Sequence, residues 1–109
     1  MQIKINTQHL HLYPQQEALV LKKVEHLTTL ADRLTDESSQ VRVDLAHEES
    51  RRSEDAYDCR ITFFVPQDTL RAEAHGDTLV NALDEVIDKI KTQIEHYKAK
   101  IHRVSKRKG

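Results

Sequence analysis

The chain has 109 residues, of which 38% are hydrophobic and 32% are charged, with a formal net charge of −1; this is enough apolar material for the core of one ordinary domain. Its two Gly and two Pro exclude a flexible linker, no run of about 18 apolar residues could span a membrane, and the first residues lack the apolar stretch of a secretory signal. The single Cys cannot form an internal disulfide, so we predict a cytoplasmic protein.

The N-terminal third of the chain predicts one strand and one helix. Residues 1–7 alternate, with Ile3 and Ile5 on one face, which is typical of a half-buried strand. Pro14 suits the start of a helix, and residues 15–34 then have apolar side chains at three- and four-residue steps. These apolar residues are Val20, Val24, Leu27, Ala31 and Leu34.

The middle of the chain predicts three more strands, because residues 41–47, 57–65 and 68–75 each alternate between apolar and other side chains. Residues 48–55 between the first two contain no apolar side chain and are predicted to form a solvated hairpin loop. Pro66 ends the second of these strands. After the third, Gly76 marks a turn, and Asp77 is the preferred cap of the last helix, with Thr78 as a weaker candidate.

The predicted order is therefore β-α-β-β-β-α, an α+β fold. The last three strands should form an antiparallel meander, and the helical crossover allows the first two strands to pair in parallel. Two helices then cover one face of a four-stranded sheet in a two-layer sandwich. Phe64 falls on the opposite, polar face, where we expect edge packing, with base stacking as the alternative. The other side chains of this face are Lys4, Arg42, Asp44, Arg60, Thr62, Arg71 and Glu73.

The last helix carries most of the positive charge. Residues 89–109 contain eight Lys or Arg against one acidic residue, Glu95, so this segment carries +7 and the rest of the chain −8. On a helical projection a basic and polar ridge of Lys89, Gln93, His96, Lys100 and Arg103 lies beside the apolar stripe. The stripe consists of Leu79, Leu83, Val86, Ile87, Ile90, Ile94, Tyr97 and Ile101. The ridge predicts a polyanion-binding surface, and the alternative is that it serves only helix stability and solubility.

Signals for catalysis or metal binding are weak. His9 and His11 could form half of a metal site, but no second close pair of His or Cys completes it. Asp84 and Asp88 lie one helical turn apart without a nearby nucleophile or Gly-rich loop, so we expect solvated carboxylates. The chain has no phosphate-binding loop and no nucleophile-elbow motif. We therefore predict no enzyme, no metal, no cofactor and no small-molecule substrate.

The whole domain resembles a known family. The segments DRL (residues 32–34), LRAEA (residues 70–74) and ALDEVIDKI (residues 82–90), in this order within the β-α-β-β-β-α pattern, resemble the ribosome hibernation promoting factor family, which includes the ribosome-associated inhibitor A proteins. The likeness covers Met1 to about Ile101. It implies a protein that binds the small ribosomal subunit in the channel for messenger and transfer RNA and blocks translation under stress.

The same resemblance implies the partners and the organisation of the chain. The partners would be 16S rRNA and ribosomal proteins, without a membrane, and the protein would be a monomer off the ribosome. Residues 1–102 would form the ribosome-binding domain and residues 103–109 a basic, flexible tail, so the chain looks like the short form of the family. The loop at residues 48–55 could also contact a ribosomal protein.

The RNA-binding residues combine the family's basic positions with the tail. Asp88, Lys89, Gln93, Lys98 and Lys100 match the family pattern, whereas Thr92 and His96 replace an Arg and a Lys that are usual there. On the first helix Lys23 matches a basic position and His26 replaces another. The predicted RNA-binding residues are Lys23, Lys89, Gln93, His96, Lys98, Lys100, Arg103, Lys106, Arg107 and Lys108. The alternative is a protein-interaction module whose basic ridge binds an acidic partner protein.

Overall fold

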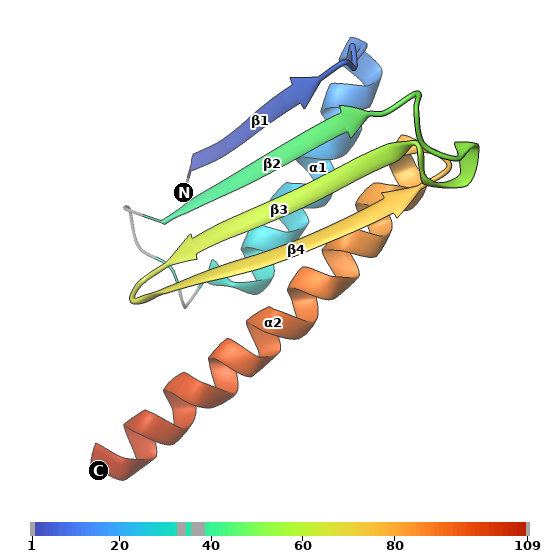
Figure 1. Cartoon of the computed structure of the whole chain (residues 1–109). Coiled ribbons are helices and arrows are strands. Elements are labelled where there is room, and N and C mark those ends of the chain that lie inside the picture. The colour runs from blue at the N-terminus through green and yellow to red at the C-terminus, as the bar shows by residue number, and fades with distance from the viewer. Residues whose placement is uncertain (1, 33–34, 36–38, 109) are drawn as a thin grey trace.

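The computed structural model describes residues 2–32, 35 and 39–108, with the side chains described as far as Ile101. The elements follow the predicted β-α-β-β-β-α order, with one short 3-10 helix, η2, added in the loop before the third strand (Figure 1). They are β1 (Gln2–Gln8), α1 (Pro14–Leu30), β2 (Gln40–His47), η2 (Ser53–Asp55), β3 (Tyr57–Val65), β4 (Asp68–Gly76) and α2 (Leu79–Lys108).

The four strands form one mixed sheet in the order β1-β2-β3-β4. β1 and β2 pair in parallel, with Ile3 opposite Val41 and Ile5 opposite Val43. The β2–β3 and β3–β4 pairs are antiparallel. Both helices lie on the same side of the sheet (Figure 1), so the predicted two-layer α+β sandwich is confirmed.

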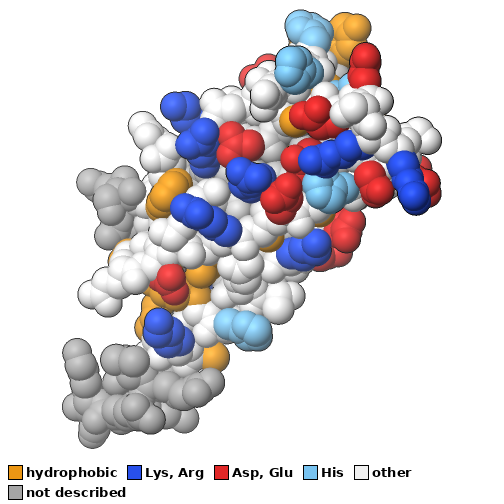
Figure 2. Space-filling model, viewed as in Figure 1, with side chains coloured by type: hydrophobic (Ala, Val, Ile, Leu, Met, Phe, Trp, Pro, Cys, Tyr) orange, Lys and Arg blue, Asp and Glu red, His pale blue; other side chains and the backbone are white. Residues whose placement is uncertain are grey.

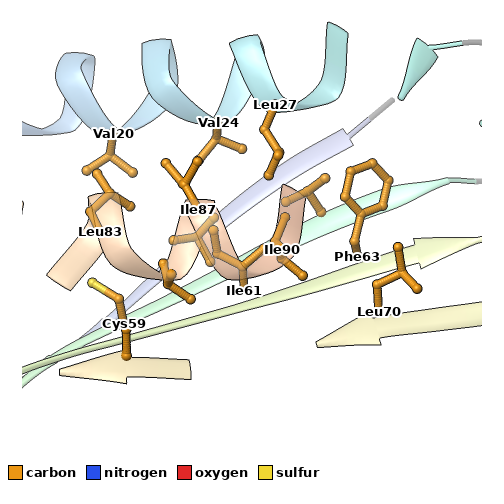
Figure 3. Close-up of a cluster of buried hydrophobic side chains, with 14 of the residues drawn as sticks. Val20, Val24, Leu27, Cys59, Ile61, Phe63, Leu70, Leu83, Ile87 and Ile90 are labelled. Atoms are coloured by element: carbon orange, nitrogen blue, oxygen red, sulfur yellow. The ribbon is translucent and has the colours of Figure 1, made fainter. Parts of the chain in front are cut away.

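The core lies between the helix layer and the inner face of the sheet. Figure 3 shows Val20, Val24 and Leu27 of α1 pointing toward α2 and the sheet, and Phe63 and Leu70 approaching from the strands. Both the helical three- and four-residue spacing and the two-residue strand spacing bring apolar side chains to this interface. The largest side chains that are fully buried include Phe63, Leu27, Leu45, Ile61, Leu83, Ile90 and Ile94.

Helix α1 ends at Leu30, earlier than the predicted end at Leu34, and Leu34 itself lies outside the described residues. The hydroxyl groups of Thr28 and Thr29 both donate to the carbonyl of Glu25, at 2.7 and 3.0 Å. Threonine side chains that bond back to the preceding turn compete with regular helical geometry. Two of them in the last turn therefore favour an early end of the helix.

The start of α2 corrects two details of the prediction. Gly76 is the last residue of β4, without a positive φ, and is not part of a turn. Thr78 caps the helix, because its Oγ1 accepts a hydrogen bond of 3.1 Å from the backbone N–H of Asn81, three residues further along. Asp77, the predicted cap, instead accepts a 2.7 Å hydrogen bond from the side-chain amide of Asn81.

Helix α2 continues beyond the end of the sheet (Figure 1). The hydroxyl of Tyr97 donates a 2.7 Å hydrogen bond to the carbonyl of Pro66 at the β3–β4 turn, which fixes the helix where the sheet ends. Ile101, predicted in the core stripe, is 38% exposed because no strand lies beneath it. The backbone of the predicted tail is helical from residue 103 to 108, and the molecule measures 53 × 25 × 17 Å.

Candidate nucleic-acid interface

The first two residues of the predicted ridge bind the edge of the sheet. The side-chain amide of Gln93 accepts a 3.0 Å hydrogen bond from the backbone N–H of Arg71 and donates one to the carbonyl of the same residue. One turn earlier, Nζ of Lys89 donates a 2.9 Å hydrogen bond to the carbonyl of Glu73. Both side chains therefore pair with backbone groups of β4, which is an edge strand of the sheet.

This contact gives Lys89 and Gln93 a structural role. An edge strand presents unpaired N–H and C=O groups that can template pairing with another chain, and native proteins often cover such edges. Gln93 satisfies both backbone groups of Arg71, and Lys89 satisfies one of Glu73. The Lys89 side chain remains 50% exposed, and its Nζ also lies 3.9 Å from Glu85 Oε1.

The next predicted residues lie at and beyond the end of the sheet. His96 and Lys100 are exposed and make no hydrogen bond or ion pair within the described part of the chain. Lys98 Nζ lies 3.4 Å from Glu95 Oε1, and this pair is exposed, so it contributes little to stability. These three positive or titratable side chains are thus available to a partner. Arg103, Lys106, Arg107 and Lys108 follow on the same helix, with side chains outside the described part.

Lys23 belongs to a different surface, the groove between α1 and α2. Its Nζ lies 2.7 Å from Asp84 Oδ1, an ion pair that joins the two helices. The groove has a volume of about 820 Å³, and its walls also carry Lys22, His26 and Lys91. These three side chains were not among the predicted site residues, because the meeting of the two helix flanks depends on how the helices dock.

A charged network occupies the outer face of the sheet near η2. Ligand atoms of Asp58, Glu73 and His75 lie within 4.8 Å of one another, the arrangement that a metal ion would need. Arginines already contact it, because Arg51 Nη1 lies 2.8 Å from His75 Nδ1 and Arg60 Nη2 lies 3.3 Å from Glu73 Oε2. Their two positive charges offset the two carboxylates, which disfavours a cation here.

Burial and the neighbouring Glu73 carboxylate raise the pKa of Asp58 above its ordinary value. Burial also acts to raise the pKa of Glu73, but its hydrogen bonds with Asp58 and Arg60 outweigh this effect and lower it. Asp58 is therefore the more basic of the two carboxyls.

Two further residues considered for chemistry are Cys59 and His11. Burial raises the pKa of the Cys59 thiol to about 12, with a smaller contribution from Asp58, so the thiol is not a nucleophile at neutral pH. The ring of His11 packs edge-on against Tyr13, with centroids 5.0 Å apart. No described helix is long and apolar enough to cross a membrane.

Comparisons with known proteins agree with this architecture. A ribosomal subunit interface protein from Coxiella burnetii is 20% identical, with a TM-score of 0.74 over 91% of this chain and 99% of its own. The N-terminal domain of Protein Y from Thermus thermophilus is 23% identical, with a TM-score of 0.70 over 89% of this chain and 99% of its own. A comparison with curated protein sequences found no match.

The two structural matches show the fold, and the sequence itself shows the family. Residues 3–102, nearly the whole described domain, match the family described as Sigma 54 modulation protein / S30EA ribosomal protein. This match confirms the resemblance to the hibernation factors. The chain belongs to the Sigma 54 modulation protein / S30EA ribosomal protein family.

Proposed function

We propose that this protein binds the small ribosomal subunit through phosphate contacts to 16S rRNA and thereby suppresses translation under stress. Its family is named for ribosomal proteins, and a structural relative is named as a ribosomal subunit interface protein. The observation that carries the proposal is the position of Lys98 and Lys100. Both follow Tyr97, whose hydroxyl binds the Pro66 carbonyl at the β3–β4 turn, so their side chains can reach a partner that the folded domain does not occupy.

The chemistry of this end of α2 suits rRNA. Folded RNA presents phosphates in fixed positions, and a helix that presents cations at a regular spacing can follow them without reading bases. The basic residues at 103–108 continue the same helix, so up to six Lys or Arg side chains follow Tyr97. Such binding is entropically favoured by the release of counterions and weakens steeply with salt.

The proposal includes the cellular setting. The protein acts in the cytoplasm as a binding factor and not as an enzyme, and it is a monomer when it is off the ribosome. The groove between α1 and α2 adds a second basic surface with Lys22, His26 and Lys91. Acidic side chains share that groove, so we expect it to contribute less than the exposed end of α2.

The test is co-sedimentation of the full chain with purified small ribosomal subunits over a salt series. We compare the wild type with Lys98→Glu plus Lys100→Glu. If each lysine neutralises one phosphate, the double variant should lower the slope of log affinity against log salt by about 2 and weaken binding at every salt concentration. A truncation after His102 measures the contribution of residues 103–109 in the same assay.

Arg51→Glu plus Arg52→Glu is the control, because it makes the same change in net charge away from both the end of α2 and the groove between the helices. Both arginines lie directly before η2. If this control loses as much affinity as the α2 variant, overall charge accounts for the binding, and the proposed contact is wrong. Absence of wild-type binding at low salt would reject ribosome binding. Capture of a protein partner that survives nuclease treatment would then favour the protein-interaction module.

A further inference from the structure

The outer face of the sheet carries a row of cations that the strand register assembles from three strands. Lys4 lies opposite Arg42, Arg42 opposite Thr62, and Thr62 opposite Arg71. Directly opposed side chains point to the same face of a sheet. Lys4, Arg42, Thr62 and Arg71 therefore form one transverse row, the cation row, which spans about 14 Å over three inter-strand spacings.

The cation row is bordered differently on its two sides. On one side, the neighbouring row consists of Asp44, Arg60 and Glu73 and so contains two carboxylates. In this row Arg60 Nη2 lies 3.3 Å from Glu73 Oε2. On the other side the register aligns Gln40, Phe64 and Thr69, which are uncharged. Figure 2 shows this face, with Lys and Arg side chains gathered across the strands and the acidic side chains mostly toward the end of the sheet near η2.

The face is hollowed next to Phe64. A shallow hollow of about 440 Å³ is lined by Thr62, Phe64, Ala72, the three arginines Arg42, Arg60 and Arg71, and the two carboxylates Asp44 and Glu73. Thr62 is only 6% exposed although it points outward, so it forms part of the floor, whereas Phe64 is 37% exposed. Arg42 is paired with Asp44 at 3.2 Å, but the side chains of Arg71 and Lys4 make no ion pair within the described residues.

We propose that this face binds unpaired RNA, with a base stacked on Phe64 and the adjacent phosphates held by Arg71, Arg42 and Lys4. An exposed aromatic ring on a sheet beside cations is a general platform for single-stranded nucleic acid, because every base can stack and every phosphate is anionic. Arginine can bind a phosphate through two N–H groups at once. The flanking Gln40 amide offers a donor and an acceptor to base edges.

An acidic peptide fits this face less well than unpaired RNA. It would satisfy the cations but would leave the aromatic ring and the neutral row without partners. The surface is on the opposite face of the sheet from the helices, so this inference goes beyond the proposed ribosome contact of α2. Each of the two proposals can therefore fail without the other.

The test is a titration of the isotopically labelled full chain with a six-nucleotide uridine RNA at low salt, followed by NMR. The expected result is saturable shifts at Thr62, Phe64, Thr69 and Arg71. Phe64→Leu keeps the strand apolar but removes the stacking ring, and we expect it to weaken binding about tenfold. Phe64→Tyr keeps a ring and should bind within about twofold of the wild type. Arg71→Gln should lower the slope of log affinity against log salt by about 1.

Two controls separate RNA binding at this face from simple attraction between opposite charges. Arg52→Glu should leave the affinity for the RNA within about twofold, because Arg52 lies beside η2 and outside the cation row. A poly-glutamate peptide of equal charge should not displace the RNA. Shifts confined to α2, unchanged affinity of Phe64→Leu, displacement by poly-glutamate, or no binding at low salt would each overturn the proposal. The spectra of all variants also report whether they are folded.

Discussion

Gly76 permits a close approach between β4 and helix α2, and replacing it tests the fold directly. A Cβ added to Gly76 would lie 2.8 Å from the backbone N of Ala82, 3.1 Å from its Cα and 3.2 Å from its Cβ. The first two contacts are with helix backbone, so a side-chain rotation cannot relieve them. Gly76→Ala must therefore push the first turns of α2 away from the end of β4.

The expected loss of stability follows from two opposing terms. Overpacking of a tight contact costs about 1–3 kcal/mol. Replacing Gly by Ala stabilises by about 0.4–1 kcal/mol, because the unfolded chain loses conformational freedom. We expect Gly76→Ala to lower the free energy of unfolding by about 1–2 kcal/mol, which corresponds to a decrease of about 5–10 °C in Tm.

The assay is urea unfolding followed by circular dichroism, in which the midpoint should fall while the m-value stays constant. Thr69→Ala on the same strand is the control, and we expect its change to be within about 0.5 kcal/mol because Thr69 is exposed. Gly76→Asn should be at least as destabilising as Gly76→Ala, because its side chain is larger. If Asn were tolerated better than Ala, Gly76 would be needed for a positive φ, as in a turn, and the close approach would be refuted as the reason for glycine.

Three further predictions concern buried or hydrogen-bonded groups. Burial raises the pKa of Cys59 from 9.0 to about 12, so the native protein should have about a thousandfold less thiolate than an ordinary thiol. A thiol reagent at pH 8 should therefore modify Cys59 only after denaturation. Rapid modification of the folded protein would contradict this prediction. The raised pKa of Asp58 means that the protonated carboxyl stabilises the fold at acidic pH and that this contribution is lost as the pH rises through the folded-state pKa. Asp58→Asn should therefore have a higher urea midpoint than the wild type at pH 7 but not at pH 3. A variant midpoint that lies below the wild-type midpoint by the same amount at both pH values would contradict this prediction. Tyr97→Phe removes the donor to the Pro66 carbonyl and should cost about 1 kcal/mol in the same unfolding assay; an unchanged midpoint would show that water replaces the hydroxyl.

Prediction of the candidate site from sequence was less complete than prediction of the fold. The helical projection placed Lys89 and Gln93 correctly beside the apolar stripe, but it gave no sign that they bind the β4 backbone. It also extended the core stripe to Ile101, because a periodic pattern does not indicate where the underlying sheet ends. The sequence predicted that the end of α2 is basic. It could not predict that this end extends beyond the sheet, because that depends on how the helix docks.

The amino-acid sequence by itself determined the order of the elements and, with Ile101 as an exception, the side chains that face the core. These features depend on periods of two and 3.6 residues, which are local properties of the chain. Tertiary structure decided what Gly76 permits, what Gln93 binds, and that Lys4, Arg42 and Arg71 share one row on the sheet. Each of these depends on the register between segments far apart in the chain. Strand register and helix docking are chosen by the packing of the whole core, and no single segment carries that information.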